Sequence, residues 1–392
     1  MYTIEMLPAS LGDCLWIEYG DPAAPTRILI DGGTVGTIDA IRAKISAVAA
    51  KEGRCRFELV VVTHVEADHI EGIIKLLGEP SLPVDIDDLW FNGSHHLPDP
   101  DAVNEAEFLG GKQGDFLSLL IRKRGISWNR HPWEGKTIWV PSTGDLPTCQ
   151  LPGGMEIVLL SPTFNELLKL SQAWDKELAA AGLRNWNDEQ VLEVLLASRT
   201  LAPRDDFLGE DEGFLGDAID IPALVGAAKQ SDRSAANASS IAFLASFGDK
   251  RCLFAGDAYS EVLQRSVERL LQSSSEDRLA VEAFKLPHHG SRANVHDNLL
   301  ACLDCQRFLV STDGSRFKHP DTQAIARVVG GGWRANPRQD RLVELNFNYR
   351  TTINEKWDDE ALRAVWNYRI VFPTPTACDD NPEPGLVVTI TS

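Results

Sequence analysis

The sequence predicts an α/β protein in which polar side chains gather at the carboxyl ends of β-strands. Short apolar runs of strand length alternate with segments of helical spacing, as in residues 27–77. Several of these runs end close to His or Asp, and residues 58–62, for example, run into Thr63 and His64. Because α/β proteins bind ligands outside the carboxyl ends of their strands, these polar loops are candidate functional sites.

The composition indicates a globular chain with an acidic balance of charge. Of 392 residues, 43% are hydrophobic, and the formal net charge is −19. A core of ordinary size can form from such a chain. A broad surface for duplex DNA is disfavoured, since phosphate binding depends on Lys and Arg. Bound metal ions could still supply positive charge locally.

The cysteines and the N-terminus favour a cytoplasmic protein. Seven cysteines are scattered along the chain, which does not indicate a disulfide framework. The first residues lack a basic segment followed by an apolar one, and no apolar run reaches the roughly 18 residues of a membrane span. We therefore expect no membrane association, while the oligomeric state stays open.

The alternation of elements is regular in two parts of the chain. The expected strands share short apolar runs: residues 2–7, 14–19, 27–30, 58–62, 239–247, 252–255, 281–286 and 307–311. The expected helices share apolar residues at helical spacing: 38–51, 70–77, 259–272, 298–305 and 322–329.

The region between these two parts differs in composition. Residues 78–232 are rich in Pro, Gly, Asp and Trp, and we interpret them as a large insertion. Within it we expect helices at 165–181 and 188–198, an acidic loop at 200–216, and strands near 137–141 and 155–160. The predicted organisation is one domain, with a core of residues 1–77 and 235–335, an insertion of about 78–232 and a C-terminal extension of about 336–392.

The densest group of metal-ligand side chains lies in residues 63–69. His64 and His69 supply two imidazoles, and Glu66 and Asp68 supply two carboxylates. This mixture of donors suits Zn, Mn, Fe or Co better than Mg or Ca. The alternative is a solvated loop that carries two histidines by chance.

Three further strand ends carry residues of the same kinds. Asp257 follows an apolar run, and one carboxylate can bridge two cations about 3.5–4 Å apart. The adjacent His288 and His289 cannot point the same way from extended chain, so we expect one to bind metal and the other to lie behind it or face substrate. His319 precedes a proline. Each could be an ordinary turn residue, but their joint occurrence favours a metal site.

These motifs resemble those of the metallo-β-lactamase-fold hydrolases. The closest resemblance is to the soluble catalytic domain of the ComEC-type competence proteins and their free-standing relatives. The similar segments are residues 11–15, 30–33, 63–69, 237–241, 254–258, 286–291 with its His-His-Gly-Ser motif, and 318–320. Together the matching regions cover about residues 1–77 and 235–330.

The resemblance implies an αββα metallo-β-lactamase sandwich that holds two divalent metal ions, Zn or Mn. The implied ligands are imidazoles and carboxylates: His64 and Glu66 for one ion, Asp68, His69 and either His288 or His289 for the other, and Asp257 as the bridge. A metal-bound water or hydroxide, its pKa lowered towards about 7, would be the nucleophile.

The resemblance also implies roles around the metal ions. Asp68 and His319 are the predicted catalytic residues, the first orienting the water and the second stabilising or protonating the leaving oxygen. Asn237, Gly290 and Ser291 are the predicted substrate-binding residues, with the Gly290 amide and Ser291 placed to hold a phosphate oxygen.

Two positions depart from the pattern of the wider superfamily. Glu66 stands where many members have His or Asp, which makes the site harder and favours Mn over Zn. Asn237 stands about where a third-motif His would be, and a neutral amide is a poor zinc ligand. The competence-type branch also has Asn there, so we interpret this as a trait of the branch.

The predicted function is a metal-dependent hydrolase, and more specifically a phosphodiesterase or nuclease acting on DNA or RNA. The best basic cluster, Arg122, Lys123, Arg124 and Arg130, is either a solvated helix end or a rim that guides phosphates. One alternative is a hydrolase of a small ester, lactone or β-lactam-like substrate, since the fold does not settle the function. Another is a catalytically weak metal-binding interaction protein. A regulatory partner protein that keeps a nuclease inactive is a further hypothesis.

Overall fold

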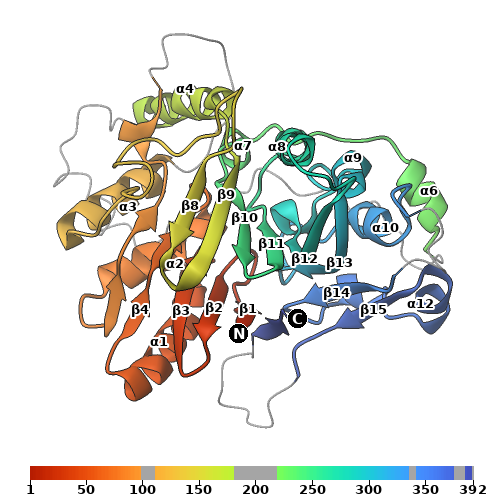
Figure 1. The fold of residues 1–392 in the computed structure, drawn as a ribbon, viewed down its shortest axis with the longest axis horizontal. Coiled ribbons are helices and arrows are strands. Elements are labelled where there is room, and N and C mark those ends of the chain that lie inside the picture. The colour runs from red at the N-terminus through yellow and green to blue at the C-terminus, as the bar shows by residue number, and fades with distance from the viewer. Residues whose placement is uncertain (99–110, 181–218, 335–340, 375–384, 391–392) are drawn as a thin grey trace.

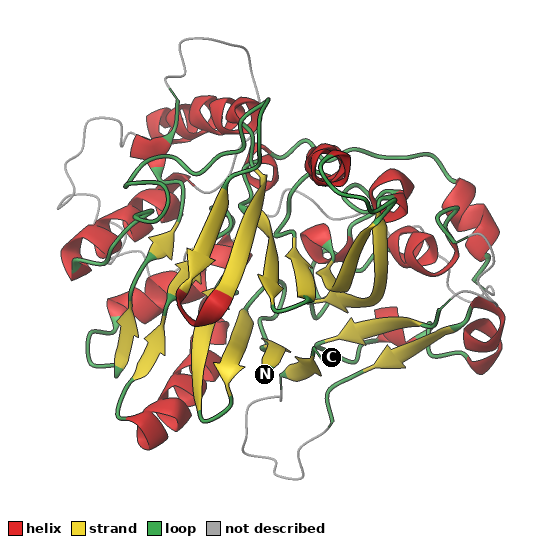
Figure 2. Cartoon of the chain, viewed as in Figure 1, coloured by secondary structure: helices red, strands yellow, loops and turns green. Residues whose placement is uncertain are grey.

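Two β-sheets face each other in the structure, a computed structural model, and helices lie along their outer sides (Figures 1 and 2). The structure describes the chain except for residues 99–110, 181–218, 335–340, 375–384 and 391–392. The first sheet has the strand order β16-β1-β2-β3-β5-β7, and the second has the order β15-β14-β13-β12-β11-β10-β9-β8.

The first sheet is antiparallel from β16 to β3 and parallel from β3 to β7. Its strands are β1 (Tyr2–Met6), β2 (Leu15–Asp21), β3 (Ala24–Ile30), β5 (Leu59–Val61), β7 (Leu89–Trp90) and β16 (Leu386–Thr389). The neighbouring elements are η1 (Val35–Thr37), α1 (Ile38–Glu52), α2 (Ala67–Gly78), η2 (Ser94–His96), α3 (Gly111–Arg124) and the short pair β4 (Cys55–Phe57) and β6 (Val84–Ile86).

The second sheet is parallel from β11 to β15 and antiparallel from β8 to β11. Its strands are β8 (Thr148–Leu151), β9 (Met155–Ser161), β10 (Ala242–Phe247), β11 (Lys250–Phe254), β12 (Leu279–Lys285), β13 (Leu303–Val310), β14 (Val343–Phe347) and β15 (Tyr368–Val371). The helices of this half are η4 (Pro152–Gly154), α4 (Phe164–Ala180), α6 (Ile221–Gly226), α7 (Ala235–Ala238), α8 (Ser260–Gln272), η5 (Pro287–Gly290), α9 (Asp297–Ala301), α10 (Thr322–Gly330), α11 (Thr352–Glu355) and α12 (Glu360–Trp366).

Alternation along the strands of the first sheet builds two separate cores. Ile17 and Ile28 face the second sheet and belong to the core between the sheets. Their sequence neighbours Trp16 and Leu29 face the other way and pack under the helices α1 and α2. Successive strand side chains point to opposite faces, so one sequence fills both layers. The predicted α/β class and the αββα order of layers are confirmed. The assignment to the metallo-β-lactamase type stays a prediction.

Several elements within the predicted insertion and extension belong to the two sheets. The expected strand at 155–160 is confirmed as β9, while residues 137–141 form only a single bridge, between Val140 and Thr163. The expected helix at 298–305 ends early, because Leu303–Val310 is a buried strand. The expected helix at 188–198 and the acidic loop at 200–216 lie outside the described residues. The division into core, insertion and extension stays a prediction. No helix in the described part of the chain is long and apolar enough to cross a bilayer.

Candidate metal centre

The carboxylate of Asp257, which follows β11, is surrounded by four imidazoles. His69 Nε2 lies 3.4 Å from Asp257 Oδ1. The other oxygen, Asp257 Oδ2, lies 3.9 Å from His64 Nε2 and 3.7 Å from His289 Nε2. His288 Nε2 also lies 3.9 Å from this oxygen. Residues up to 225 positions apart in the sequence therefore present the same ring atom to one carboxylate.

Two groups of ligand atoms form around this carboxylate. His64, His69 and Asp257 offer atoms that all lie within 4.8 Å of one another, and so do Asp68, His69 and His289. His289 Nε2 is 3.3 Å from Asp68 Oδ2. The two groups share His69, and both lie against Asp257. Asp257 therefore lies between two overlapping groups of candidate ligand atoms.

Four atoms that face the centre have no hydrogen-bond partner among the residues that the structure describes. The Nε2 atoms of His64, His69 and His289 and the Oδ1 atom of Asp257 are buried and unpaired. Buried polar atoms nearly always have a partner, and leaving one unpaired costs about 1–3 kcal/mol. Imidazole nitrogen and carboxylate oxygen are together the donors that divalent transition metals prefer. The residues present therefore fit metal ions.

The outward-facing nitrogen of each imidazole is held by a neighbour. His69 Nδ1 lies 2.8 Å from Asp31 Oδ2, and His64 Nδ1 lies 3.0 Å from Thr63 Oγ1. Asp31 in turn accepts hydrogen bonds from the Thr63 amide and hydroxyl, both at 2.7 Å. Such partners fix the ring orientation and the tautomer of a metal-binding histidine. Asp31 was absent from the predicted site residues, although it directly follows β3 in a segment that carried the family resemblance.

A second carboxylate missed at the sequence level lies behind His289. Asp13 Oδ2 is 2.6 Å from Lys285 Nζ, and Asp13 Oδ1 is 3.3 Å from His289 Nδ1. All three side chains are buried. Burial by itself would raise the pKa of Asp13, but Lys285 and then His289 outweigh it and lower this pKa. The signal in the sequence that could have identified the pair of Asp13 and Lys285 is a lysine at the end of an apolar run of strand length.

Two glycines let these carboxylates reach the site. A Cβ atom on Gly12 would lie 1.6 Å from the carbonyl oxygen of Asp68, and one on Gly32 would lie 2.4 Å from a backbone nitrogen of α2. The loops after β1 and β3 can therefore bond directly to the first turn of α2, as the Gly32 amide does to the His69 carbonyl at 2.7 Å. Any larger residue would push both loops away.

Both histidines of the adjacent pair turn towards Asp257. His288 and His289 have φ values of +48° and +53°, which is a left-handed conformation that splays the two rings. His288 Nδ1 lies 3.0 Å from Asn294 Oδ1 and 3.3 Å from Asp232 Oδ2. The expectation that one histidine of the pair binds metal and the other lies behind it or faces substrate stays a prediction.

Glu66 and Asn237 lie at the margin of the cluster. Glu66 precedes α2 and accepts a hydrogen bond of 2.9 Å from the Ser234 hydroxyl. Burial, followed by Asp68 and Asp257, raises the pKa of Glu66 to about 7. Asn237 Nδ2 donates to Asp232 at 2.8 Å, while its buried Oδ1 has no partner. Their predicted roles as ligand and substrate contact stay predictions.

The remaining predicted residues border the histidine pair. The His319 ring centre is 5.2 Å from that of His288, and its buried Nδ1 has no hydrogen-bond partner. Ser291 is buried, and its hydroxyl accepts from the Ala293 amide at 3.3 Å. Gly290 accepts a backbone bond from Asp321. The structure thus brings these residues to the cluster, and their substrate roles stay predictions.

The carboxylates control the charge of the imidazoles. Burial opposes a charged ring, but Asp257 and then Asp232 outweigh it and raise the pKa of His288 to about 10. Burial also opposes a charged His289 ring, but Asp257 and then Asp13 outweigh it and raise the pKa of His289 to about 9. His64 Nδ1 faces the Thr63 hydroxyl and not a carboxylate, and burial and then His69 lower the pKa of His64 to about 3. The site as a whole favours cations.

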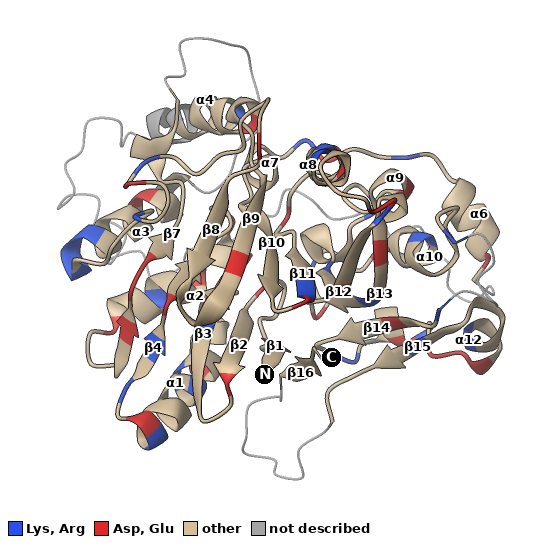
Figure 3. Cartoon of the chain, viewed as in Figure 1, with Lys and Arg blue, Asp and Glu red and all other residues tan. Residues whose placement is uncertain are grey.

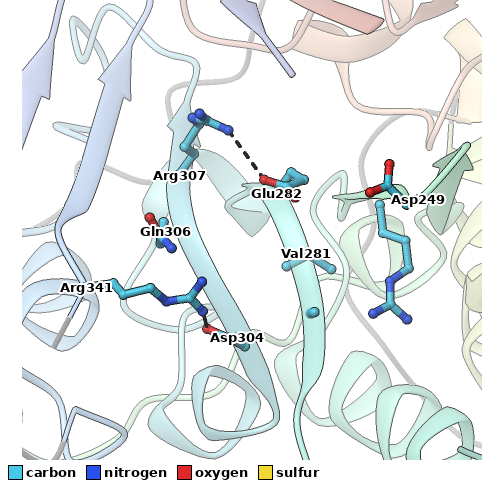
Figure 4. A pocket seen from close by; sticks show the side chains of 9 residues that line it. Asp249, Val281, Glu282, Asp304, Gln306, Arg307 and Arg341 are labelled. Carbon is cyan, nitrogen blue, oxygen red and sulfur yellow. Dashed lines mark hydrogen bonds and ion pairs between the residues drawn. The ribbon is translucent and has the colours of Figure 1, made fainter. Parts of the chain in front are cut away.

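A different cavity lies at the other end of the same parallel strands (Figure 4). It has a volume of about 120 Å³ and is lined by the N-terminal halves of β11, β12 and β13: Asp249, Arg251, Ala280, Val281, Glu282, Asp304, Gln306, Arg307 and Arg341. Its guanidinium groups pair with carboxylates, as Arg341 does with Asp304 and Arg307 with Glu282. No histidine or cysteine lines it, so it offers a metal no imidazole or thiolate ligand.

Comparison with known proteins gives little beyond this geometry. No family model and no curated protein matches the chain. Among solved structures, it is similar to CmlA, a diiron β-hydroxylase from Streptomyces venezuelae, with a TM-score of 0.33, 13% identity and coverage of 83% of this chain and 46% of CmlA. A mutant of CmlA gives a TM-score of 0.34, 13% identity and coverage of 83% and 48%. The chain spans about half the length of these structures, and a likeness at this level supports no statement about activity.

Proposed function

We propose that this chain is a metal-dependent hydrolase that binds two divalent ions and cleaves phosphodiester bonds in nucleic acid. The observation that carries the proposal is the convergence of four Nε2 atoms on Asp257, three of them buried and without a partner. We assign His64, His288 and Asp257 to one ion, and Asp68, His69, His289 and Asp257 to the other.

The fixed charges of the site favour divalent cations. Six carboxylates lie at the centre and in its immediate surroundings: Asp13, Asp31, Glu66, Asp68, Asp232 and Asp257. Lys285 balances one of them. With neutral imidazoles, two divalent ions would offset more of the remaining negative charge than a single ion would. Uncompensated buried charge is strongly unfavourable.

The assignment of His288 explains how the centre can work with Asn237 in place of a histidine. Asn237 Nδ2 is 3.4 Å from His288 Nδ1, so the amide stands behind the imidazole that reaches Asp257. In this proposal His288 supplies the nitrogen ligand that the wider superfamily takes from its third motif. The first ion is then held by two imidazoles and one carboxylate.

When bound, the two ions would act as Lewis acids and lower the pKa of a coordinated water towards about 7. The protein side chains orient the reactants. Asp68, 15% exposed at its side chain, would accept a hydrogen bond from a water held there. Burial lowers the pKa of His319, so its neutral ring beside His288 would stabilise the leaving oxygen by donating a hydrogen bond. The His64 and His69 side of the site is sealed from bulk water by burial.

Three cationic residues that are adjacent in the sequence to residues of the cluster support an anionic substrate. Arg233 lies between Asp232 and Ser234, Arg292 follows Ser291, and Lys318 precedes His319. In a chain of net charge −19, cations beside the site raise the local concentration of anions. Resemblance to the competence-type motifs adds nucleic acid as the specific anion.

The strongest basic run of the sequence has a different position. Gly114, near the start of α3, packs beside Val65 at the metal centre, whereas Arg122, Lys123 and Arg124 lie in the last turn of that helix (Figure 3). Ten residues of α-helix span about 15 Å, so this run is not at the mouth of the site. A substitution in this run is therefore a suitable control for the hydrolysis assay.

A hydrolysis assay tests the proposal directly. Metal-stripped protein is loaded separately with Mn²⁺, Zn²⁺ or Fe²⁺ and given bis(p-nitrophenyl) phosphate, single-stranded DNA and plasmid DNA. We expect metal-dependent cleavage that falls by at least about 10³-fold in Asp257→Ala and is unchanged in Lys123→Gln. No cleavage of any phosphodiester at two bound ions per chain would contradict the proposal. Turnover of p-nitrophenyl acetate alone would then favour the small-ester hydrolase.

A further inference from the structure

We propose that Asn348 is a positioning residue for the metal centre, and that the C-terminal part of the chain therefore belongs to the site. Asn348 does not touch a proposed ligand. It holds the two groups that fix the orientation of His289. This inference rests on the proposed role of His289 as a ligand, and it does not depend on which bond is hydrolysed.

Asn348 directly follows β14, at the same edge as the metal centre. β14 pairs in parallel with β13, so the ends of the two strands lie side by side (Figure 1). The Asn348 amide donates to the Val310 carbonyl at 3.2 Å, which continues the pairing past the strand end. The side chain is 2% exposed and points into the protein.

The Asn348 side chain ties three segments of the chain together. Its Oδ1 accepts from the Thr312 amide at 2.9 Å. Its Nδ2 donates to the Leu7 carbonyl at 3.1 Å and to Ser311 Oγ at 3.1 Å. Ser311 Oγ in turn donates to the Gly12 carbonyl at 2.7 Å. The loop after β1, the end of β13 and the end of β14 are thus joined through one amide.

The joined segments carry both acceptors that lie at His289 Nδ1. The Ser311 carbonyl oxygen is 2.9 Å from this nitrogen, and Asp13 Oδ1 is 3.3 Å from it. Asp13 belongs to the loop that begins at Leu7. The Leu7 carbonyl accepts from Asn348, and the Leu7 amide donates to the Cys14 carbonyl, which closes the loop around Asp13. Asn348 therefore holds the environment that keeps Nε2 of His289 turned towards Asp68 and Asp257.

The chemistry of the amide suits this position. One acceptor and two donor contacts are used in a single planar group, with an amide, a carbonyl and a hydroxyl as partners. Alanine would leave these buried partners without bonds. Aspartate would place a charge next to the Leu7 carbonyl and remove both donors. A second tie reinforces the first, since the Tyr349 hydroxyl accepts from the Ser10 amide at 2.9 Å in the same loop.

The test compares two buried asparagines, Asn346 within β14 and Asn348 directly after it. Asn346 lies two residues before Asn348 and is 1% exposed, but its side chain reaches only the Phe308 and Glu344 carbonyls, at 3.5 and 3.4 Å. Asn346→Ala thus controls for the loss of a buried amide. Stepwise metal affinities are measured by competition with a chromophoric chelator, and the Co²⁺ absorption spectrum is recorded. His289→Ala identifies the binding step that belongs to the ion of Asp68, His69 and His289.

We expect Asn348→Ala to weaken that one step by about tenfold and to change its Co²⁺ spectrum, because partners behind a ligand tune metal affinity by about 10–100-fold. The other step, and both steps in Asn346→Ala, should stay as in the wild type. Ser311→Ala breaks the connection between Asn348 and the Gly12 segment, so it should also weaken the binding step of His289. If Asn348→Ala does not fold, the result for Ser311→Ala tests the inference in its place.

Two results would overturn the inference. One is an unchanged affinity of the His289 step in Asn348→Ala or, if that variant does not fold, in Ser311→Ala. The other is an equal weakening of both steps in the two asparagine variants, which would indicate general destabilisation. A wild-type chain that binds two ions but cleaves no phosphodiester would refute the proposed function and leave this inference standing, because its readout is affinity and not turnover.

Discussion

The two ends of the strands β11, β12 and β13 hold charged groups in opposite ways. At the carboxyl ends, the polar atoms around Asp257 are buried and several have no partner. At the N-terminal halves, the charged side chains that line the cavity of Figure 4 have ion-pair partners, either in the lining or next to it. Unpaired buried groups are costly unless a ligand satisfies them, so they mark a functional site better than a cavity does.

The paired end forms a ladder of charges across neighbouring strands. Lys250 Nζ lies 3.2 Å from Glu282, whose other oxygen is 3.6 Å from Arg307. Arg307 is also 3.7 Å from Glu344, which pairs with Arg369 on β15. These side chains are partly exposed, and ion pairs of this kind contribute little to stability. The two ends should therefore respond very differently to pH and to substitution.

The largest expected effect is the pH dependence of metal binding. The pKa values of about 10 for His288 and 9 for His289 mean that both rings are protonated in the metal-free protein at pH 7. Burial opposes a charged His69 ring, but Asp257 and Asp31 outweigh it and raise the pKa of His69 well above its ordinary value. Ligand imidazoles must be neutral, so binding should release at least two protons, and the overall affinity should rise by at least about 100-fold per pH unit up to about pH 9. Calorimetry in buffers of different ionisation enthalpy measures the number released.

The stability of the metal-free protein should change with pH in the opposite sense. A histidine whose folded pKa is raised above 6.5 contributes stability that is complete below pH 6.5 and is lost as the pH rises through 9 to 10. Thermal unfolding of metal-free protein should therefore shift to lower temperature over this range. In the calorimetric experiment, a heat of metal binding that does not depend on the buffer would show that the His288 and His289 rings are already neutral in the metal-free protein.

A smaller effect is expected from the group behind His69. Asn in place of Asp31 keeps the acceptor for the Thr63 amide but presents an N–H to His69 Nδ1, which favours the tautomer with its proton on Nε2. Asp31→Asn should weaken metal binding by about 10–100-fold. Chelator competition measures this, and Asp304→Asn at the paired end is the matched control. Equal affinities in the two variants would mean that Asp31 does not set the tautomer.

Much of this centre could be predicted from the sequence, because its central residues follow strands with clear apolar patterns. His64, Asp257 and the His288–His289 pair are of that kind, and their types alone indicate metal ligands. Glu66 was expected to share the loop with Asp68 and His69. The start of α2 at Ala67 instead leaves Glu66 before the helix and turned to Ser234. A helix start inside a motif changes which side chains share a face.

The supporting residues could not be predicted, because their roles depend on contacts between distant parts of the chain. Asn348 meets Leu7 across 341 positions, and Asp31 meets His69 across 38. Asp232, at the end of the predicted insertion, reaches His288 only because both segments border the same edge. No local pattern distinguishes these residues from ordinary polar residues near strand ends.

The smallest expected effect is at the centre of the charge ladder. Glu282→Gln removes the carboxylate between Lys250 and Arg307, but the Glu282 side chain is 35% exposed and water replaces much of the lost interaction. We expect the free energy of unfolding to fall by less than about 1 kcal/mol, with a smaller difference at high salt. Denaturant titration at two salt concentrations measures both.

Metal affinity should be unchanged in Glu282→Gln, since the ladder and the metal centre lie at opposite ends of the same strands. A loss of metal binding in Glu282→Gln would show that the two ends are coupled, and the contrast between a site with unpaired groups and a ladder of paired charges would no longer separate function from structure.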